Sequence, residues 1–147
     1  MAAMCELARL SDLAASVLRQ HADAPAVCSV ECLPGSVVRR ARVSLQVWSS
    51  DDVGKLRAVA GWAVEWDSAV LFNAAGSASG SVQVLTRLEA VTAGGPVDVE
   101  VWAFVDPSSV ASLGLDLPTG IEVPVSADVV LSQLDSTASG APGSCDG

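Results

Sequence analysis

Two segments of the chain have the spacing of apolar residues that is typical of amphipathic helices. Within 5–23, apolar side chains recur every three or four positions and form a single stripe, made of Leu7, Leu10, Ala14, Val17 and Leu18. A shorter stripe over 50–60 predicts a second helix, for which Ser49 or Ser50 is suited as the N-cap. Gly61 follows it, and glycine readily adopts the left-handed conformation at which many helices end.

Alternating apolar and polar residues, rich in valine, predict extended strands in the rest of the chain. The segments with this pattern are 26–33, 36–48, 62–66, 69–72, 82–92, 97–106 and 121–125. The turn at 34–35 would join the first two as a hairpin, and residues 93–96 would join the fifth to the sixth. The third and fourth segments form either two short strands or one bent strand. Pro124 cannot donate a backbone hydrogen bond, so the last strand is expected at a sheet edge.

The order of these elements indicates the fold class. Adjacent strands joined by short turns favour an antiparallel sheet whose helices pack on one face. We therefore predict an α+β fold with an antiparallel sheet of about five strands, two main helices on one face and a short C-terminal helix over 126–135. The 147-residue chain is expected to form a single domain over 1–135. Residues 136–147 have no large apolar side chain and are expected to be a disordered tail.

One pattern occurs twice in the predicted strands. Residues 43–48 and 97–102 both read Val-x-x-x-Val-Trp. Alternation along a strand places the valines on one face and the tryptophans, Trp48 and Trp102, on the other. The two halves of the chain are faintly alike around this pattern, but the second half lacks an equivalent of the 50–60 helix, which argues against a duplication. The pattern therefore indicates that both tryptophans leave the aliphatic face of the sheet.

The hairpin made by 82–92 and 97–106 allows its cross-strand pairs to be predicted. With a four-residue loop, Arg87 lies opposite Trp102 and Glu89 lies opposite Glu100. Arg87 would then make a cation–π contact with Trp102 and offset the repulsion between the two carboxylates. A one-residue slip would move every side chain to the other face, so this register is a hypothesis.

The face opposite the aliphatic stripe is expected to gather aromatic and arginine side chains, namely Trp48, Trp102, Phe104, Arg40, Arg42 and Arg87. Tryptophan and arginine contribute most strongly to contacts between proteins. Two interpretations remain open. Either the aromatic side chains cover the rim of the core and the arginines pair with glutamates on a hydrated face, or the six side chains bind another protein or a second copy of the chain.

A second candidate site lies in 62–72. If 62–66 is a strand, Trp62 and Trp66 share one face and could line a small-molecule pocket with Phe72, with Glu65 or Asp67 as its polar group. This alternative is a ligand-binding domain or an enzyme without a recognisable motif. The glycine-rich segment Gly-Ser-Ala-Ser-Gly-Ser lacks the lysine of a phosphate-binding loop and the setting of a nucleophile elbow.

Charge and cysteine content narrow the classes of function. The formal charge is −9, from 17 acidic and 8 basic residues, and an acidic chain repels nucleic-acid phosphates. The sequence has no pattern of a signal peptide or membrane span, so we expect a cytoplasmic protein with reduced cysteines. Cys28 and Cys32 would lie ~13 Å apart on a strand, too far for a disulfide, and no second cysteine pair completes a zinc site.

These observations together predict a small acidic protein-interaction module without catalytic activity, metal or cofactor. Its expected partner is another protein, with homodimerisation as an additional expectation, and neither nucleic acid nor membrane is expected to bind. Compact acidic proteins of this kind are common among accessory genes, including those of bacteriophages and mobile elements.

Overall fold

The computed structural model describes residues 2–74, 80–118 and 120–145, and the side chains within 4–74, 80–118 and 120–136. In these ranges the helices are α1 (Ala2–Gln20), α2 (Asp52–Glu65), α3 (Pro107–Ala111) and α4 (Ala127–Cys145). The strands are β1 (Val27–Leu33), β2 (Ala41–Val47), β3 (Val70–Asn73), β4 (Val82–Thr92), β5 (Gly95–Val105) and β6 (Glu122–Val125). The predicted α+β class is confirmed.

The strands form one six-stranded sheet in the order β1-β2-β5-β4-β3-β6. The predicted count of about five is roughly right, but the sheet is mixed because β2 and β5 pair in parallel. Both predicted hairpins, β1 with β2 and β4 with β5, are antiparallel. The parallel pair joins strands that are separated along the chain by α2, β3 and β4. No short turn connects them, so the sequence has no local pattern that predicts their pairing.

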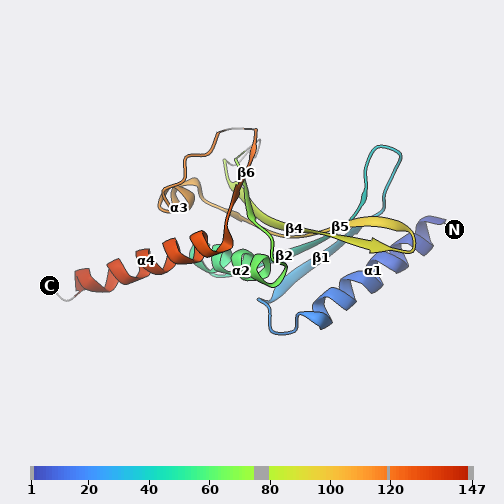
Figure 1. Ribbon diagram of the computed structural model, residues 1–147, viewed down its shortest axis with the longest axis horizontal. Coiled ribbons are helices and arrows are strands. Elements are labelled where there is room, and N and C mark those ends of the chain that lie inside the picture. The colour runs from blue at the N-terminus through green and yellow to red at the C-terminus, as the bar shows by residue number, and fades with distance from the viewer. Residues whose placement is uncertain (1, 75–79, 119, 146–147) are drawn as a thin grey trace.

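The helices of the described ranges cover one face of this sheet. Figure 1 shows α1, α2 and α4 on the same side, while the loop between β1 and β2 rises on the opposite side. The side chains toward the helices form the core, with Val43, Leu45, Val99 and Val101 fully buried. We call the opposite side the outer face; its side chains alternate with those of the core and include Arg42, Ser44, Gln46, Gln83, Leu85, Arg87, Glu89, Asp98, Glu100, Trp102 and Phe104.

The register of the β4–β5 hairpin differs by two residues from the predicted one. Thr92 pairs with Gly95, so the turn holds two residues instead of four. The hydroxyl of Thr92 donates to the carbonyl of Gly95 (2.8 Å), and Gly95 has a φ of 111°, which L side chains rarely adopt. The prediction that Arg87 lies opposite Trp102 is therefore wrong: Arg87 faces Glu100. A shift of two residues leaves every side chain on its predicted face.

Helix α2 is longer than the predicted 50–60 helix. It begins after Asp51, whose side chain accepts a hydrogen bond from the Gly54 N–H (2.8 Å), so the N-cap is Asp51 rather than either serine. It continues through Gly61 to Glu65. A Cβ atom at Gly61 would lie 3.0 Å from the Pro25 ring, so this glycine permits close packing and does not end the helix.

The segment 62–66, predicted as a strand, instead forms the end of α2 and its C-cap, Trp66, and its tryptophans belong to the core. Trp62 is 1 % exposed and donates its indole N–H to the carbonyl of Pro25 (2.8 Å). The rings of Trp62 and Trp66 pack edge to face at 5.3 Å, and the His21 ring lies 5.6 Å from Trp62. Phe72 is fully buried. Trp62 and Trp66 thus pack on each other and on His21, and Phe72 is buried on β3, so these side chains lend no support to the ligand pocket expected there.

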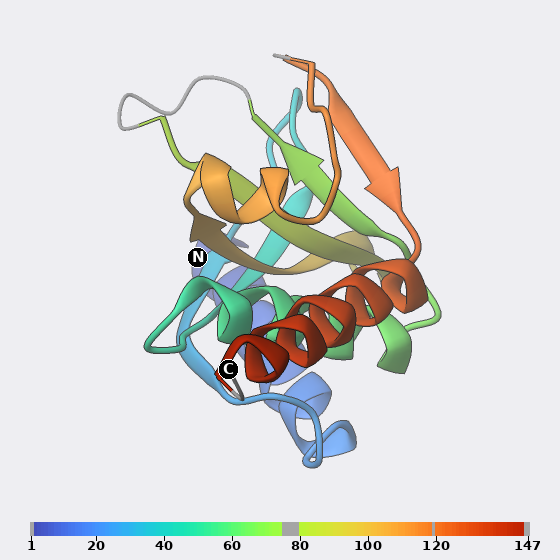
Figure 2. The same cartoon turned by 90° about the vertical axis from the view of Figure 1, so that its left-hand side faces the viewer.

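Helix α4 packs against α2, and Figure 2 shows it in front of α2, below the sheet. Its buried residues are Ala127, Val130 and Leu134, and Asp135 forms an ion pair with Arg57 (2.9 Å). The helix continues to Cys145, through most of the segment expected to be a tail, and 146–147 lie outside the described residues. None of the helices described combines the length and apolar character that a bilayer crossing requires.

Candidate functional site

The structure brings the six predicted binding residues to one side of the sheet. Alternation along the strands places all of them on the outer face or at its ends. They are Arg40 just before β2, Arg42 on β2, Trp48 just after β2, Arg87 on β4, and Trp102 and Phe104 on β5. None of the helices that the structure describes covers this side in Figure 1. The aromatic residues lie toward the end of β2 and β5, and the arginines lie toward the beginning.

The aromatic end consists of Trp48, Trp102 and Phe104, and its members differ in exposure. Trp102 is partly buried and donates its indole N–H to the Ser44 hydroxyl at 2.6 Å, which fixes the orientation of its ring. The Phe104 ring packs edge to face on it at 5.2 Å. Trp48 and Phe104 are 66 % and 44 % exposed. Trp102 therefore supports the aromatic end, while Trp48 and Phe104 present apolar surface to the solvent.

The arginines line a hollow with three carboxylates between them. Its volume is about 440 Å³, and its lining side chains are Arg40, Arg42, Arg87, Glu89, Asp98 and Glu100. We call it the charged hollow. Arg40 binds Glu89 at 2.7 Å and Asp98 at 3.4 Å, so it offsets the repulsion between two carboxylates that face each other across β4 and β5.

Glu100 is the central carboxylate of the charged hollow and is only 5 % exposed. One of its oxygens lies 3.5 Å from a terminal nitrogen of Arg42, and the other lies 3.6 Å from Nε of Arg87. The Nε atom of Arg42 is buried and has no hydrogen-bond partner among the described residues. Arg42 therefore keeps an N–H donor that no acceptor among the described residues uses.

Arg87 connects the charged hollow to the far edge of the sheet. Its guanidinium binds Glu122 of β6 at 3.2 Å. Because β3 lies between β4 and β6, this side chain must pass over the outer side of β3. Beneath it, Leu85 is 1 % exposed although it lies on the uncovered face, where its neighbours across the strands are Trp102 and Leu71. The outer face is thus packed and held in place by its own side chains.

The ion pairs of Arg40 with Glu89 and of Arg87 with Glu122 shift the pKa values of both arginines. The pKa of Arg40 is raised, chiefly by its hydrogen bond to Glu89. The pKa of Arg87 is also raised: desolvation lowers it, but Glu122 and Glu100 together outweigh that effect. Arginine is already charged at every pH at which proteins fold. The charged hollow therefore carries permanent positive charges, and its three arginines face four carboxylates when Glu122 is included, close to neutral on a chain of charge −9.

Sequence reasoning missed two of the acidic residues that hold these arginines. Asp98 follows the same alternation as Glu100, so its place on the outer face could have been inferred from that pattern. Glu122 lies 35 positions from Arg87, and no local pattern relates the two residues.

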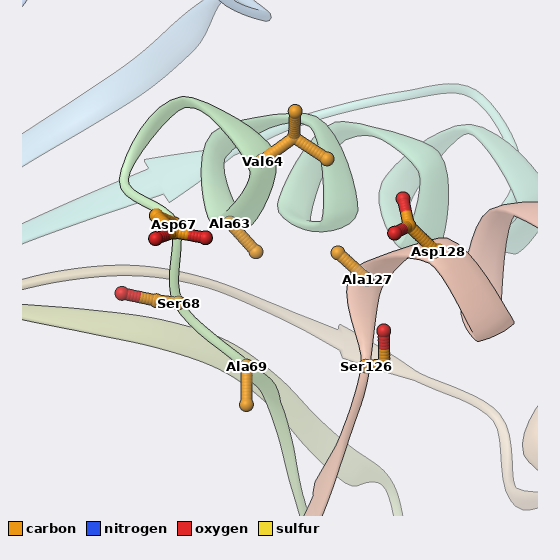
Figure 3. Close-up of a pocket in the computed structure, with 8 residues that line it drawn as sticks. All are labelled: Ala63, Val64, Asp67, Ser68, Ala69, Ser126, Ala127 and Asp128. Carbon is orange, nitrogen blue, oxygen red and sulfur yellow. The ribbon is translucent and has the colours of Figure 1, made fainter.

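A second hollow of about 340 Å³ lies where α2 ends and α4 begins. Figure 3 shows Asp67 and Ser68 on the segment that leaves α2, with Ser126 and Asp128 at the start of α4. The hydroxyl oxygen of Ser68 lies 3.3 Å from the carbonyl oxygens of both Trp66 and Arg87, so its proton is directed to the backbone. In the part of the chain that the structure describes, no three histidine, cysteine or acidic side chains are arranged to hold a metal ion.

Asp67 ends α2 in a conformation that suits glycine better. Its φ is 51°, in the left-handed region. The N–H of Ser68 donates to Ala63 (2.9 Å) and that of Asp67 donates to Val64 (3.1 Å), as in a Schellman motif. The carboxylate also lies at the negative end of the helix dipole. Asp67 is therefore strained and unfavourably charged at this position.

We expect Asp67→Gly to stabilise the protein by about 0.5–1 kcal/mol, because relief of left-handed strain exceeds the extra entropy of an unfolded glycine. Urea denaturation of the variant and the wild type measures this difference. Asp67→Asn is the matched control, since asparagine also tolerates the left-handed region but lacks the charge. A loss of stability in Asp67→Gly would show instead that the carboxylate makes a stabilising contact.

The cysteines form no disulfide among the described residues: Cys5, Cys28 and Cys32 are free thiols. Comparison of the chain with protein-family models, curated proteins and solved structures finds no match.

Proposed function

We propose that this protein acts by binding another protein through the outer face of its sheet, and that it performs no chemistry there. The observation that carries the proposal is the exposure of two aromatic side chains, Trp48 and Phe104, on the sheet face opposite the described helices (Figure 1). Large aromatic side chains lose apolar contact with water when a partner covers them, and such residues are often the strongest contributors to binding.

Side chains of the outer face are already held in position before a partner binds. Trp102 is held by its hydrogen bond to Ser44 (2.6 Å) and supports Phe104, so little side-chain freedom is lost at that position on binding. The charged hollow provides arginine N–H groups beside the aromatic end. A carboxylate or carbonyl oxygen of the partner can accept from them, and Arg42 Nε is a buried donor without a partner among the described residues. The aromatic end supplies affinity and the hollow supplies orientation.

The proposal includes a cytoplasmic location. The free thiols of Cys5 and Cys28 are exposed, and exposed thiols persist in a reducing compartment. The scattered surface acids and the charge of −9 favour solubility and disfavour nucleic acid as the partner. An accessory protein that modifies the action of a host protein by occupying one of its surfaces has these properties.

Affinity capture from a lysate of the native host tests the proposal. We expect the wild type to retain a specific set of proteins that Trp48→Ala/Phe104→Ala does not retain. The matched control is Val53→Ala/Val129→Ala, which shortens two side chains of similar exposure, 43 % and 48 %, on helices of the opposite side. Circular dichroism verifies that each variant is folded. Retention of the same proteins by the aromatic variant would contradict the proposal.

A further inference from the structure

The two edges of the sheet differ in their protection against pairing with another strand. At one edge, β6 has four residues and contains Pro124, which cannot donate a hydrogen bond. At the other edge, β1 has seven residues without proline or lysine, Glu31 is its only charged residue, and its β-bulge lies at its start, between Val27 and Ser29. Cys28, Ser29, Val30 and Glu31 are all exposed. Proteins usually protect long edge strands, because their free N–H and C=O groups bind other strands.

Apolar surface continues from this edge onto α1. Val30 faces the helix side, opposite the buried Leu45, yet it is 46 % exposed. On α1, Met4 and Leu7 are 73 % and 39 % exposed. A side chain placed on Gly94 would collide with Arg9, so the flank of α1 that carries Arg9 faces the β4–β5 hairpin.

Helical spacing then determines where the exposed apolar residues of α1 lie. Successive residues advance by about 100° around a helix. Leu10, Ala14 and Val17 are buried against the sheet, and Met4 and Leu7 fall on the flank opposite Arg9. Because β1 is the outermost strand on that side, this flank is turned toward the free edge. The edge strand and α1 thus both carry exposed apolar side chains on this side, Val30 on β1 and Met4 and Leu7 on α1.

We propose that a second copy of the chain occupies this edge, with the two β1 strands antiparallel about a twofold axis at Val30. This register keeps Ser29 to Glu31 in regular pairing, and the β-bulge of β1 between Val27 and Ser29 lies toward one end of the strand. Val30 faces Val30 of the second copy, Ser29 faces Glu31, and Cys28, at the bulge, lies nearest to Cys32 of the second copy. The only charged residue therefore meets a serine instead of its own copy, so no like charges lie directly opposite. Both α1 helices lie on the same side, where their apolar flanks approach each other.

The proposed dimer uses a different surface from the proposed partner-binding face, so the two proposals fail or succeed separately. The outer face carries Trp48 and Phe104, whereas the dimer edge carries Val30 and the exposed flank of α1. The resulting sheet would run through both copies and leave both outer faces uncovered, which gives a protein partner two equivalent surfaces.

Sedimentation equilibrium over a range of protein concentrations tests the dimer, at about 0.15 M salt, where a Debye length of about 8 Å screens the acidic copies from each other. We expect a monomer–dimer equilibrium for the wild type and a dissociation constant raised by at least about tenfold in Val30→Lys, which places two ammonium groups opposite each other. Val91→Lys makes the same change at a valine that is 83 % exposed on β4 and should leave the equilibrium unchanged. A wild type that stays monomeric, or a dimer insensitive to Val30→Lys, would overturn the proposal.

Disulfide trapping tests the register. In a Cys5→Ser/Cys145→Ser background, oxidation by copper–phenanthroline should join Cys28 of one copy to Cys32 of the other as a covalent dimer. Each bond forms from two thiols, which lose two protons and pass two electrons to the oxidant. Adding Cys32→Ser should abolish the covalent dimer. A dimer in sedimentation that yields no Cys28–Cys32 bond, or one still trapped without Cys32, would overturn the proposed pairing about Val30.

Discussion

Trp62→Ala is expected to lower the free energy of unfolding by about 3–5 kcal/mol, the range for removal of a large aromatic side chain from a packed core. Trp62 is 1 % exposed, and its ring contacts those of Trp66 and His21. Its indole N–H also satisfies the Pro25 carbonyl (2.8 Å), which would lose its partner. The substitution removes both packing and a hydrogen bond at the junction of α1, α2 and the sheet.

Trp48→Ala is the matched control for this experiment, because it removes the same side chain from a site that is 66 % exposed. We expect its free energy of unfolding to change by no more than about 0.5 kcal/mol. Chemical denaturation monitored by far-ultraviolet circular dichroism measures both variants. An equal loss in the free energy of unfolding in the two variants would mean that Trp48 also stabilises the fold. The proposal that its side chain is available to contact a partner would then be contradicted.

Glu100→Gln is expected to destabilise the protein by about 1–3 kcal/mol, since a buried acceptor that binds charged donors becomes neutral. Glu100 is 5 % exposed and lies between Arg42 and Arg87. The loss should be smaller than the 3–5 kcal/mol typical of a fully buried pair, because both arginine side chains are 38 % exposed and can be solvated. Glutamine retains the shape of the side chain, so the difference reports on charge.

Glu89→Gln provides the comparison within the same hollow. Glu89 binds Arg40 at 2.7 Å, but the two side chains are 54 % and 46 % exposed, and exposed ion pairs contribute little to stability. Urea denaturation of both variants should therefore rank Glu100→Gln as the more damaging. The reverse order would show that the exposed Arg40 pair, and not Glu100, holds the charged hollow together.

The outer face could be predicted from the sequence because alternation along a strand is robust. The register of the β4–β5 hairpin was wrong by two residues, yet Arg87, Trp102 and Phe104 remained on the predicted face. A period of two is insensitive to a two-residue shift. The pairing of Arg87 with Glu100 in place of Trp102, by contrast, depends on the length of the turn, which Gly95 shortens by adopting a positive φ.

The error over 62–66 has a different origin. Residues four positions apart share a face on a strand and also on a helix, so the spacing of Trp62 and Trp66 does not distinguish the two. Gly61 was interpreted as the end of a helix, whereas its role is to let α2 approach Pro25. That contact joins residues 36 positions apart in the chain. Long-range packing of this kind, like the parallel pairing of β2 with β5, leaves no local pattern.

The dissociation constant of the captured partner, measured by isothermal titration calorimetry, tests recognition by the outer face most directly. For Trp48→Ala/Phe104→Ala we expect this constant to rise by at least about 30-fold, equivalent to about 2 kcal/mol, the loss typical of a hot spot. For Val53→Ala/Val129→Ala we expect a change of no more than about twofold. An unchanged dissociation constant in the folded aromatic variant would contradict recognition through Trp48 and Phe104.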